Sequence, residues 1–286
     1  MNPLHRFFNK ELPINLRPQD STPASLKKEV NHTMETVGTY LAKLPGGDPS
    51  WLKGKIVMEI GPGPHYGVPM ILACYGALVL VADRFSPAWQ PDFHPTFYSR
   101  LLERLVEESP LIDSRPLRAV QKNQNSLKDY VKEIKTPLEK IPRSLRCSCD
   151  AIFSNAVLEH LYQPLSAIRR MAFITRPGGL GLHQIDFRDH RDFNKPLEYL
   201  LLGQIQFWKV FHWSHGECGN RLRSGEFSSI FTRGGFSISS FECNKRAEAP
   251  YLDEFLPRLR AASSAYADCK EIELRTLSGQ FQLIRI

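Results

Sequence analysis

The stretch that decides the fold is Val57–Gly67, which reads VMEIGPGPHYG. It opens with a short apolar run of the kind that forms a buried strand. The run passes into a turn in which Gly61 and Gly63 let the backbone bend sharply and approach a ligand more closely than a side chain would permit. The helix expected to follow offers free N–H groups at its N-terminus. The stretch therefore predicts a strand, a ligand-binding turn and a helix.

An acidic residue follows at the spacing of a ribose ligand. Asp83 lies twenty residues after Gly63, directly after the next predicted strand, 78–82. An acid at that position typically accepts hydrogen bonds from ribose hydroxyls. The turn, the strand before it and Asp83 together predict a cofactor that contains adenosine.

The residues of the turn favour S-adenosylmethionine over NAD. A dinucleotide site is expected to read G-x-G-x-x-G, which would place a third glycine at the position of Tyr66. Glu59 also stands just before the turn, where a carboxylate repels a pyrophosphate but suits a cation. The sulfonium and the α-amino group of S-adenosylmethionine are such cations.

Three segments resemble the class I S-adenosylmethionine-dependent methyltransferases. Glu59–Gly63 is similar to their motif I, which often carries a third glycine where His65 stands here. Asp150–His160, DAIFSNAVLEH, resembles the fourth-strand segment D-x-x-x-S-x-x-V-L-E-H of the type 11 methyltransferase-domain subgroup, and Arg176–Gly179 is similar to the turn before its fifth strand. The resemblance implies an enzyme with a doubly wound, mostly parallel seven-stranded α/β sheet, the Rossmann-like methyltransferase fold.

The same resemblance implies a set of cofactor-binding residues. Gly61 and Gly63 would wrap the methionine part of the cofactor, Glu59 would orient its amino group, and Asp83 would hold the ribose. Two residues at the end of the fourth strand would flank the sulfonium, and Asn125 would accept a hydrogen bond from the adenine amino group. The predicted set is Glu59, Gly61, Gly63, Asp83, Arg84, Asn125, Asn155 and Ala156.

Polar residues gather where the fifth predicted strand, 180–186, ends. Ligands of doubly wound folds bind beyond the carboxyl ends of the strands, so this segment is expected beside the methyl donor. A His–Asp pair there can supply a base near neutral pH. A salt-bridged loop that holds the next helix explains the same residues equally well. The predicted catalytic set is His190, Asp186 and His183, although residues three apart in a strand face opposite sides.

Strands that alternate with helices indicate β-α-β units along most of the chain. We expect an N-terminal helical extension or lid at 1–50, whose helix is capped by Thr22, and a methyltransferase domain at 51–286 with a helical insert near 195–223. Other expected strands are 56–60, 117–121, 149–154 and 236–243, with a pair around a Ser278-Gly279 turn. Expected helices are 68–75, 95–108, 126–135, 164–175, 196–212, 224–232 and 252–260.

The composition is that of an ordinary globular protein. Of the 286 residues 42% are hydrophobic and 23% charged, which excludes a disordered, collagen-like or disulfide-scaffold chain. The first twenty residues lack the apolar core of a signal peptide, and the longest apolar run, 68–82, is too short to cross a membrane, so we expect a cytoplasmic protein. His212, His215 and Cys218 have ligand-like spacing but fall short of the four ligands of a structural zinc site, so no metal is expected.

The acceptor is expected to be a small molecule, methylated on oxygen or nitrogen. No N/D-P-P-Y sequence follows the fourth strand and no Pro-Cys pair occurs, which argues against amino-methylation of bases or glutamine and against cytosine C5 methylation. The net charge of +7 allows an anionic acceptor. Two alternatives stay open: an RNA methyltransferase, which the same charge favours, and a non-catalytic cofactor-binding or scaffold protein with this fold.

Overall fold

The computed structural model describes residues 12–214 and 216–286. Its centre is a seven-stranded sheet in the order β3-β2-β1-β4-β5-β7-β6. β1 to β5 run parallel, and β7 runs antiparallel to both of its neighbours. This is the doubly wound sheet expected from the sequence. The strands are β1 (Ile56–Ile60), β2 (Leu78–Asp83), β3 (Val131–Lys135), β4 (Cys149–Asn155), β5 (Thr175–Asp186), β6 (Phe236–Arg246) and β7 (Thr276–Arg285).

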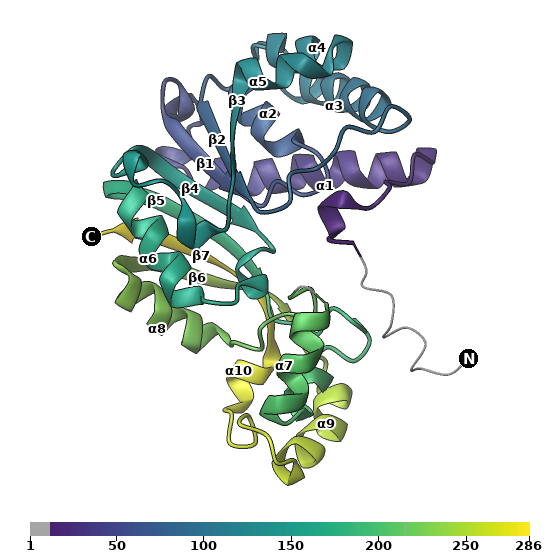
Figure 1. The fold of residues 1–286 in the computed structure, drawn as a ribbon, viewed down its shortest axis with the longest axis vertical. Coiled ribbons are helices and arrows are strands. Elements are labelled where there is room, and N and C mark those ends of the chain that lie inside the picture. The colour runs from purple at the N-terminus through teal and green to yellow at the C-terminus, as the bar shows by residue number, and fades with distance from the viewer. Residues whose placement is uncertain (1–11, 215) are drawn as a thin grey trace.

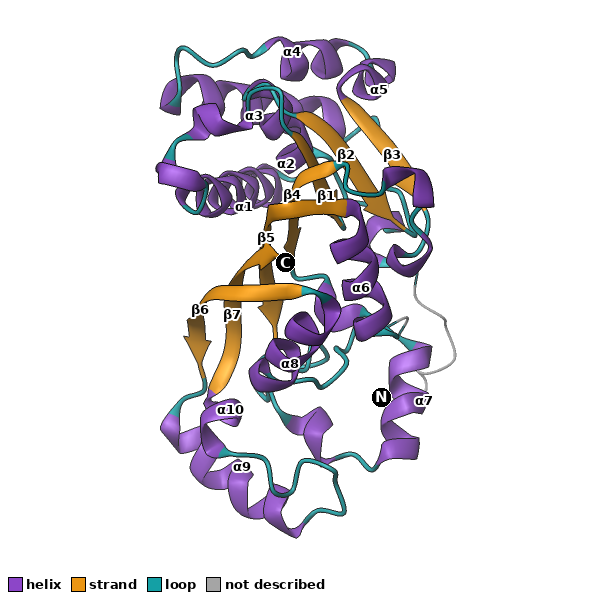
Figure 2. Ribbon diagram, turned by 90° about the vertical axis from the view of Figure 1, so that its left-hand side faces the viewer, coloured by secondary structure: helices purple, strands orange, loops and turns teal. Residues whose placement is uncertain are grey.

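Two helical layers cover the sheet, and Figure 2 shows α1 and α8 on opposite sides of it. The apolar β1 run is buried because alternate residues reach both layers: Val57 packs with the α1 side and Met58 with the α8 side. α1 begins as predicted, since Thr22 accepts a hydrogen bond from the Ser25 N–H. The first layer contains α1 (Pro23–Ala42), α2 (Gly67–Cys74), α3 (His94–Glu108) and α4 (Arg115–Lys122), and the second contains α6 (Pro164–Ile174) and α8 (Ser224–Gly234).

A smaller group of helices lies together at one end of the molecule (Figure 1). The sequence predicts one helix over 196–212, but Gly203 takes an extended conformation there and separates a short turn from α7. Phe207 and Phe211 of α7 pack into the core of this group. The group consists of the turn Glu198–Leu201, α7 (Gln204–Trp213), α9 (Ala249–Ala261) and α10 (Glu271–Arg275). In the described residues no helix is long and apolar enough to span a bilayer.

The third strand is not where the sequence predicts it. Residues 117–121 belong to α4, where Leu117 and Val120 are buried at helical spacing. The predicted helix 126–135 is instead the short helix α5 (Leu127–Tyr130) followed by β3. β3 lies at the edge of the sheet and carries charged residues, so it lacks the apolar pattern of the central strands.

The predicted turn at Ser278-Gly279 is also wrong, because both residues lie inside β7. Gly279 pairs with Cys243 and Ile185 on the two neighbouring strands. A Cβ added to Gly279 would lie 2.4 Å from Cε2 of Phe241. This glycine therefore makes room for an aromatic ring instead of turning the chain.

Arg223 joins the helical group to the sheet, which leads to a stability prediction. The side chain is 1% exposed and donates to the carbonyl oxygens of Phe187, Glu273 and Thr276. Arg223→Met removes these hydrogen bonds, and of the three carbonyls Phe187 still accepts from the Tyr199 hydroxyl. We therefore expect the free energy of unfolding to fall by about 3 kcal/mol. Urea unfolding followed by circular dichroism measures this. Arg233→Met, at an exposed position of the same helix, should change it little, and equal losses in the two variants would contradict the account.

Candidate cofactor and acceptor site

The glycine turn after β1 has the conformation that the sequence predicts. Gly61 and Gly63 have φ angles of 67° and 73°, in the left-handed region that favours glycine. A Cβ on Gly61 would lie 2.5 Å from Cγ2 of Val157, whereas among the described residues nothing lies within 4 Å of a Cβ on Gly63. The turn is therefore packed against the loop after β4 at its first glycine and open at its second.

Glu59 is buried beneath α1, with 2% of its surface exposed. Burial raises the pKa of its carboxyl group well above the usual range. No hydrogen-bond partner for its Oε2 lies in the described part of the chain. A buried carboxylate oxygen without a donor fits a cationic group such as the amino group of S-adenosylmethionine.

Asp83, at the end of β2, is held by two donors. Its Oδ1 accepts from the Phe85 N–H at 2.6 Å, and its Oδ2 accepts from Nδ2 of Asn15 at 2.8 Å. Burial raises the pKa of Asp83, and these hydrogen bonds oppose the rise. The neighbouring Arg84 is exposed, and its guanidinium lies 4.9 Å from the centre of the Phe85 ring. The contact with Asn15 comes from the N-terminal segment, which no sequence motif marks.

The end of β4 meets helix α1. Asn155 Nδ2 donates to Oγ1 of Thr36 at 3.1 Å and lies 3.5 Å from Nε2 of His32. Ala156 follows with a φ of 53°, a strained conformation for a residue with a side chain, and its N–H donates to Gln184. Strain of this kind gathers at functional sites. Thr36 and His32 were not predicted, because nothing in the sequence indicates that α1 passes over β4.

Asn125 does not join this group. Its predicted place depends on a third strand at 117–121, but in the structure Asn125 precedes β3. β3 is parallel to β2, so Asn125 lies toward the edge where the strands begin and Asp83 lies at the edge where they end. The predicted contact with adenine is therefore not supported.

A charged cluster stands at the end of β5. Asp186 Oδ1 accepts from Nε of Arg188 at 2.9 Å and Oδ2 accepts from its Nη2 at 2.5 Å, while Nε2 of His190 lies 3.5 Å from Oδ2. Burial alone would raise the pKa of Asp186, but the hydrogen bonds and positive charges of His190 and Arg188 lower it well below its usual range. Asp186 therefore stays ionised. The structure brings Asp186 and His190 together as the sequence predicts.

Two residues of the predicted fourth-strand segment contact Asp186 and His190. Glu159 Oε1 accepts from the Asp186 N–H at 3.2 Å, and burial raises the pKa of Glu159. The His160 ring lies 5.1 Å from that of His190, and its Nδ1 donates to the Gly216 carbonyl at 2.9 Å. Burial, followed by the charge of His190, lowers the pKa of His160 to about 4. His160 is therefore neutral at physiological pH.

His183 is separate from His190 and Asp186. Its side chain is fully buried on the α8 side of the sheet, where it packs on Phe231 and shares a hydrogen bond of 2.8 Å with Ser154. Burial lowers its pKa to about 3. The alternation of side chains along β5 places His183 and Asp186 on opposite faces, so the structure does not support a catalytic role for His183.

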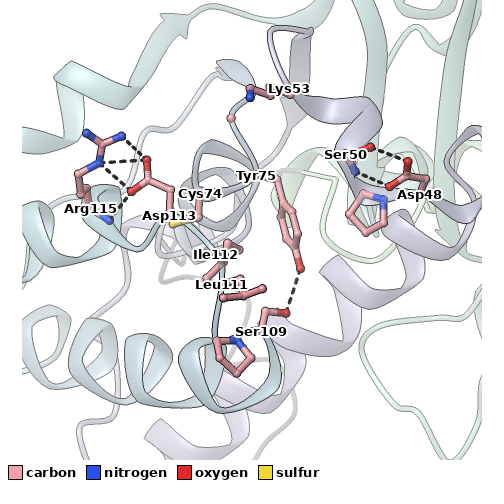
Figure 3. A pocket seen from close by; sticks show the side chains of 13 residues that line it. Asp48, Ser50, Lys53, Cys74, Tyr75, Ser109, Leu111, Ile112, Asp113 and Arg115 are labelled. Atoms are coloured by element: carbon pink, nitrogen blue, oxygen red, sulfur yellow. Dashed lines mark hydrogen bonds and ion pairs between the residues drawn. The ribbon is translucent and has the colours of Figure 1, made fainter.

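The other candidates from the sequence do not form a site. His215 lies outside the described residues, and His212 packs against Tyr162. Within residues 12–214 and 216–286 no three His, Cys, Asp or Glu side chains are grouped so as to hold a metal. A hollow near Tyr75 and Ser109 lies at the opposite edge of the sheet, beyond the end of α2 (Figure 3). It is therefore remote from the glycine turn.

Comparisons with known proteins agree with this geometry. Residues 97–182 match the family model described as "Methyltransferase domain". The matched range includes the fourth-strand segment, 150–160. A search of curated proteins finds no match. The phosphoethanolamine N-methyltransferase 2 of Haemonchus contortus, solved with S-adenosyl-L-methionine, is 14% identical with a TM-score of 0.50, and 89% of this chain aligns with 52% of that one. This chain thus spans about half the length of that enzyme.

Two further solved structures align over most of both chains. The Haloferax volcanii complex of the Trm112 methyltransferase activator with a methyltransferase gives 13% identity, a TM-score of 0.48, and coverage of 93% of this chain and 95% of that one. An S-adenosylmethionine-dependent methyltransferase from Mesorhizobium loti is 15% identical with a TM-score of 0.46, and the alignment covers 86% of this chain and 96% of that one.

The packing of Gly61 leads to a binding prediction. In Gly61→Ala the new methyl group must displace Val157, so we expect the turn to shift and the affinity for S-adenosylmethionine to fall at least tenfold, about 1.4 kcal/mol. Titration calorimetry measures the affinity. Gly47→Ala is the matched control, since Gly47 also has a left-handed φ but no neighbour within 4 Å. Equal affinities for the two variants would show that the contact with Val157 does not shape the site.

The burial of His183 leads to a pH prediction. Folded His183 stays neutral down to about pH 3, whereas the unfolded chain binds a proton near pH 6.5. Stability is therefore lost as the pH falls below 6.5, by roughly 2 kcal/mol at pH 5 from this residue. Between pH 7.5 and pH 5, the free energy of unfolding measured in urea should therefore fall by roughly 2 kcal/mol less in His183→Gln than in the wild type. His212→Gln, at an exposed position, should follow the wild type, and identical pH profiles for all three proteins would refute the assignment.

Proposed function

We propose that this chain is an S-adenosylmethionine-dependent methyltransferase that methylates an oxygen or nitrogen atom of a small-molecule acceptor. The observation that carries the proposal is the pairing of His190 with an ionised Asp186 at the end of β5. Asp186 is the last residue of β5 and His190 follows it, and β5 pairs with β4, whose end carries Asn155. A base is thus available beside the predicted methyl donor.

We assign the cofactor to the residues of the site that have an unpartnered polar atom or open space beside them. Bound S-adenosylmethionine supplies an electrophilic methyl group on a sulfonium. Glu59 receives the amino group, the turn at Gly61 and Gly63 admits the methionine part, and Asp83 accepts the ribose hydroxyls. Asn155, fixed by Thr36 of α1, bounds the methionine side.

The acceptor loses its proton to His190 in this proposal. The Asp186 carboxylate faces Nε2 of His190 and so favours a proton on that nitrogen. In the neutral form of His190 the lone pair of Nδ1 is then free to take the acceptor proton as the methyl group is transferred. Arg188 donates two hydrogen bonds to the Asp186 carboxylate, and Glu159 accepts one from the Asp186 N–H. These bonds hold the Asp186 carboxylate in its orientation toward His190.

The chain around this cluster favours a small acceptor over a polymer. Gly216 bonds His160 from one side, and Arg17 of the N-terminal segment forms an ion pair of 2.7 Å with Glu217. These contacts cover one flank of the cluster, which favours a small acceptor. The net charge of +7 still favours RNA as a second candidate, and salt-dependent RNA binding would support it. The cytoplasm is the proposed location.

The catalytic pair gives a direct test. With an acceptor found by screening small molecules for release of S-adenosylhomocysteine, His190→Ala should lower kcat about 100-fold because the base is lost. Asp186→Asn should lower it less, since the base remains but is poorly oriented. Both variants should bind S-adenosylmethionine as the wild type does, and His212→Ala should keep full activity. Unchanged kcat in His190→Ala would exclude His190 as the base.

A further inference from the structure

A segment of the N-terminal extension, residues 13–19, lies across the end of β2. We name it the strap. It contains the short 3-10 turn Ile14–Leu16, closed by a hydrogen bond from the Leu16 N–H to the Pro13 carbonyl at 2.8 Å. This turn presents Asn15 to Asp83, the residue to which we assign the ribose. The strap therefore covers part of the proposed cofactor site.

Side chains from distant parts of the chain hold the strap in place. The Gln90 carboxamide accepts from the Gln19 N–H at 2.7 Å and donates to the Arg17 carbonyl at 3.0 Å, so it pairs with the strap as a neighbouring strand would. Arg17 also forms the ion pair with Glu217 beside the proposed acceptor site. These contacts fix the strap at its carboxyl end, and Asn15 fixes its centre.

The hydrogen bonds of Asn15 are directed at the turn after β2. The side chain is 7% exposed, and its Nδ2 donates to Oδ2 of Asp83 at 2.8 Å and to the Phe85 carbonyl at 3.0 Å. Both protons of the amide are thereby used. The Phe85 N–H and the Asn15 amide approach different oxygens of the Asp83 carboxylate, and a carboxylate offers about four acceptor positions. A ribose hydroxyl can therefore bind to Asp83 while Asn15 stays in place.

We propose that Asn15 is a positioning residue for the cofactor: it holds the Asp83 carboxylate in the orientation that accepts the ribose, and the strap closes over the nucleoside. This inference rests on the proposed ribose role of Asp83. The same N-terminal extension reaches the other cofactor elements, because Glu29 lies 3.5 Å from Nε2 of His65 and Thr36 bonds Asn155. The extension thus contacts all three strand ends that form the cofactor site.

The His65–Glu29 pair also explains a departure from the family pattern. A third glycine often stands in motif I where His65 lies, and here the His65 ring is buried and packs 4.0 Å from the Phe97 ring. Its Nδ1 accepts from the Gly67 N–H, and its Nε2 faces the Glu29 carboxylate at 3.5 Å. A side chain from the turn after β1 therefore anchors α1, the helix that follows the strap.

A double-mutant cycle tests the proposal. Asn15→Ala, Asp83→Ala and the double variant are titrated with S-adenosylhomocysteine by calorimetry, and its dissociation rate is measured by stopped flow. Asn15→Ala should weaken binding about tenfold and speed dissociation. In the Asp83→Ala background the same change should have no further effect, because Asn15 acts through Asp83. Asn31→Ala, at an exposed position on α1, is the matched control and should bind as the wild type does.

Each other outcome has a defined meaning. Losses that multiply in the double variant, or tighter binding by Asn15→Ala, would overturn the proposal, since Asn15 would then act elsewhere or compete with the ribose. Normal binding by Asp83→Ala would overturn both the ribose assignment and the role of Asn15. A wild type that binds no S-adenosylhomocysteine would instead contradict the proposed function. If Asn15→Ala does not fold, Gln90→Ala releases the strap without touching Asp83, and unchanged binding and dissociation in that variant would overturn the proposal.

Discussion

The parallel register of β1 with β2 and β4 is the constraint on which the whole site depends. Ile60 pairs with Ala82 on one side and with Ser154 on the other, so all three strands end at one edge of the sheet. The Gly61 N–H extends this pairing by donating to the Ala82 carbonyl. Every residue proposed to hold the cofactor lies in the last residues of one of these strands or in the turn that follows it. A shift of register would separate them, although each local sequence would be unchanged.

Burial and charge then give different roles to the acidic residues at this edge. Glu59 is buried with an unpartnered oxygen, its pKa is raised, and a bound cation would compensate for that cost. Asp186 is also buried, but Arg188 and His190 lower its pKa and keep it charged. The first environment suits binding of an ammonium or sulfonium, and the second suits orientation of an imidazole. The two environments thus match the two roles that we propose for these carboxylates.

The central strands could be predicted from the sequence, whereas the edge of the sheet and the contacts across it could not. β1 and β4 are apolar because both of their faces are covered, whereas β3 is a charged edge strand. Because the sequence places the third strand at 117–121, it also places Asn125 wrongly beside the adenine. The bond between Asn15 and Asp83 joins residues 68 positions apart, and no local pattern encodes it. The proximity of His190 and Asp186 was predictable, because Asp186 ends one strand and His190 comes four residues later.

The most direct test of the account is amide hydrogen exchange with and without S-adenosylhomocysteine. The account predicts slower exchange on addition of the ligand in four separated segments: 13–19, 61–66, 83–90 and 155–157. These segments contain the strap, the glycine turn, the turn after β2 and the end of β4. Protection in all four together would show that one ligand contacts the edge where the strands end. No protection, or protection confined to the hollow near Tyr75, would contradict the account.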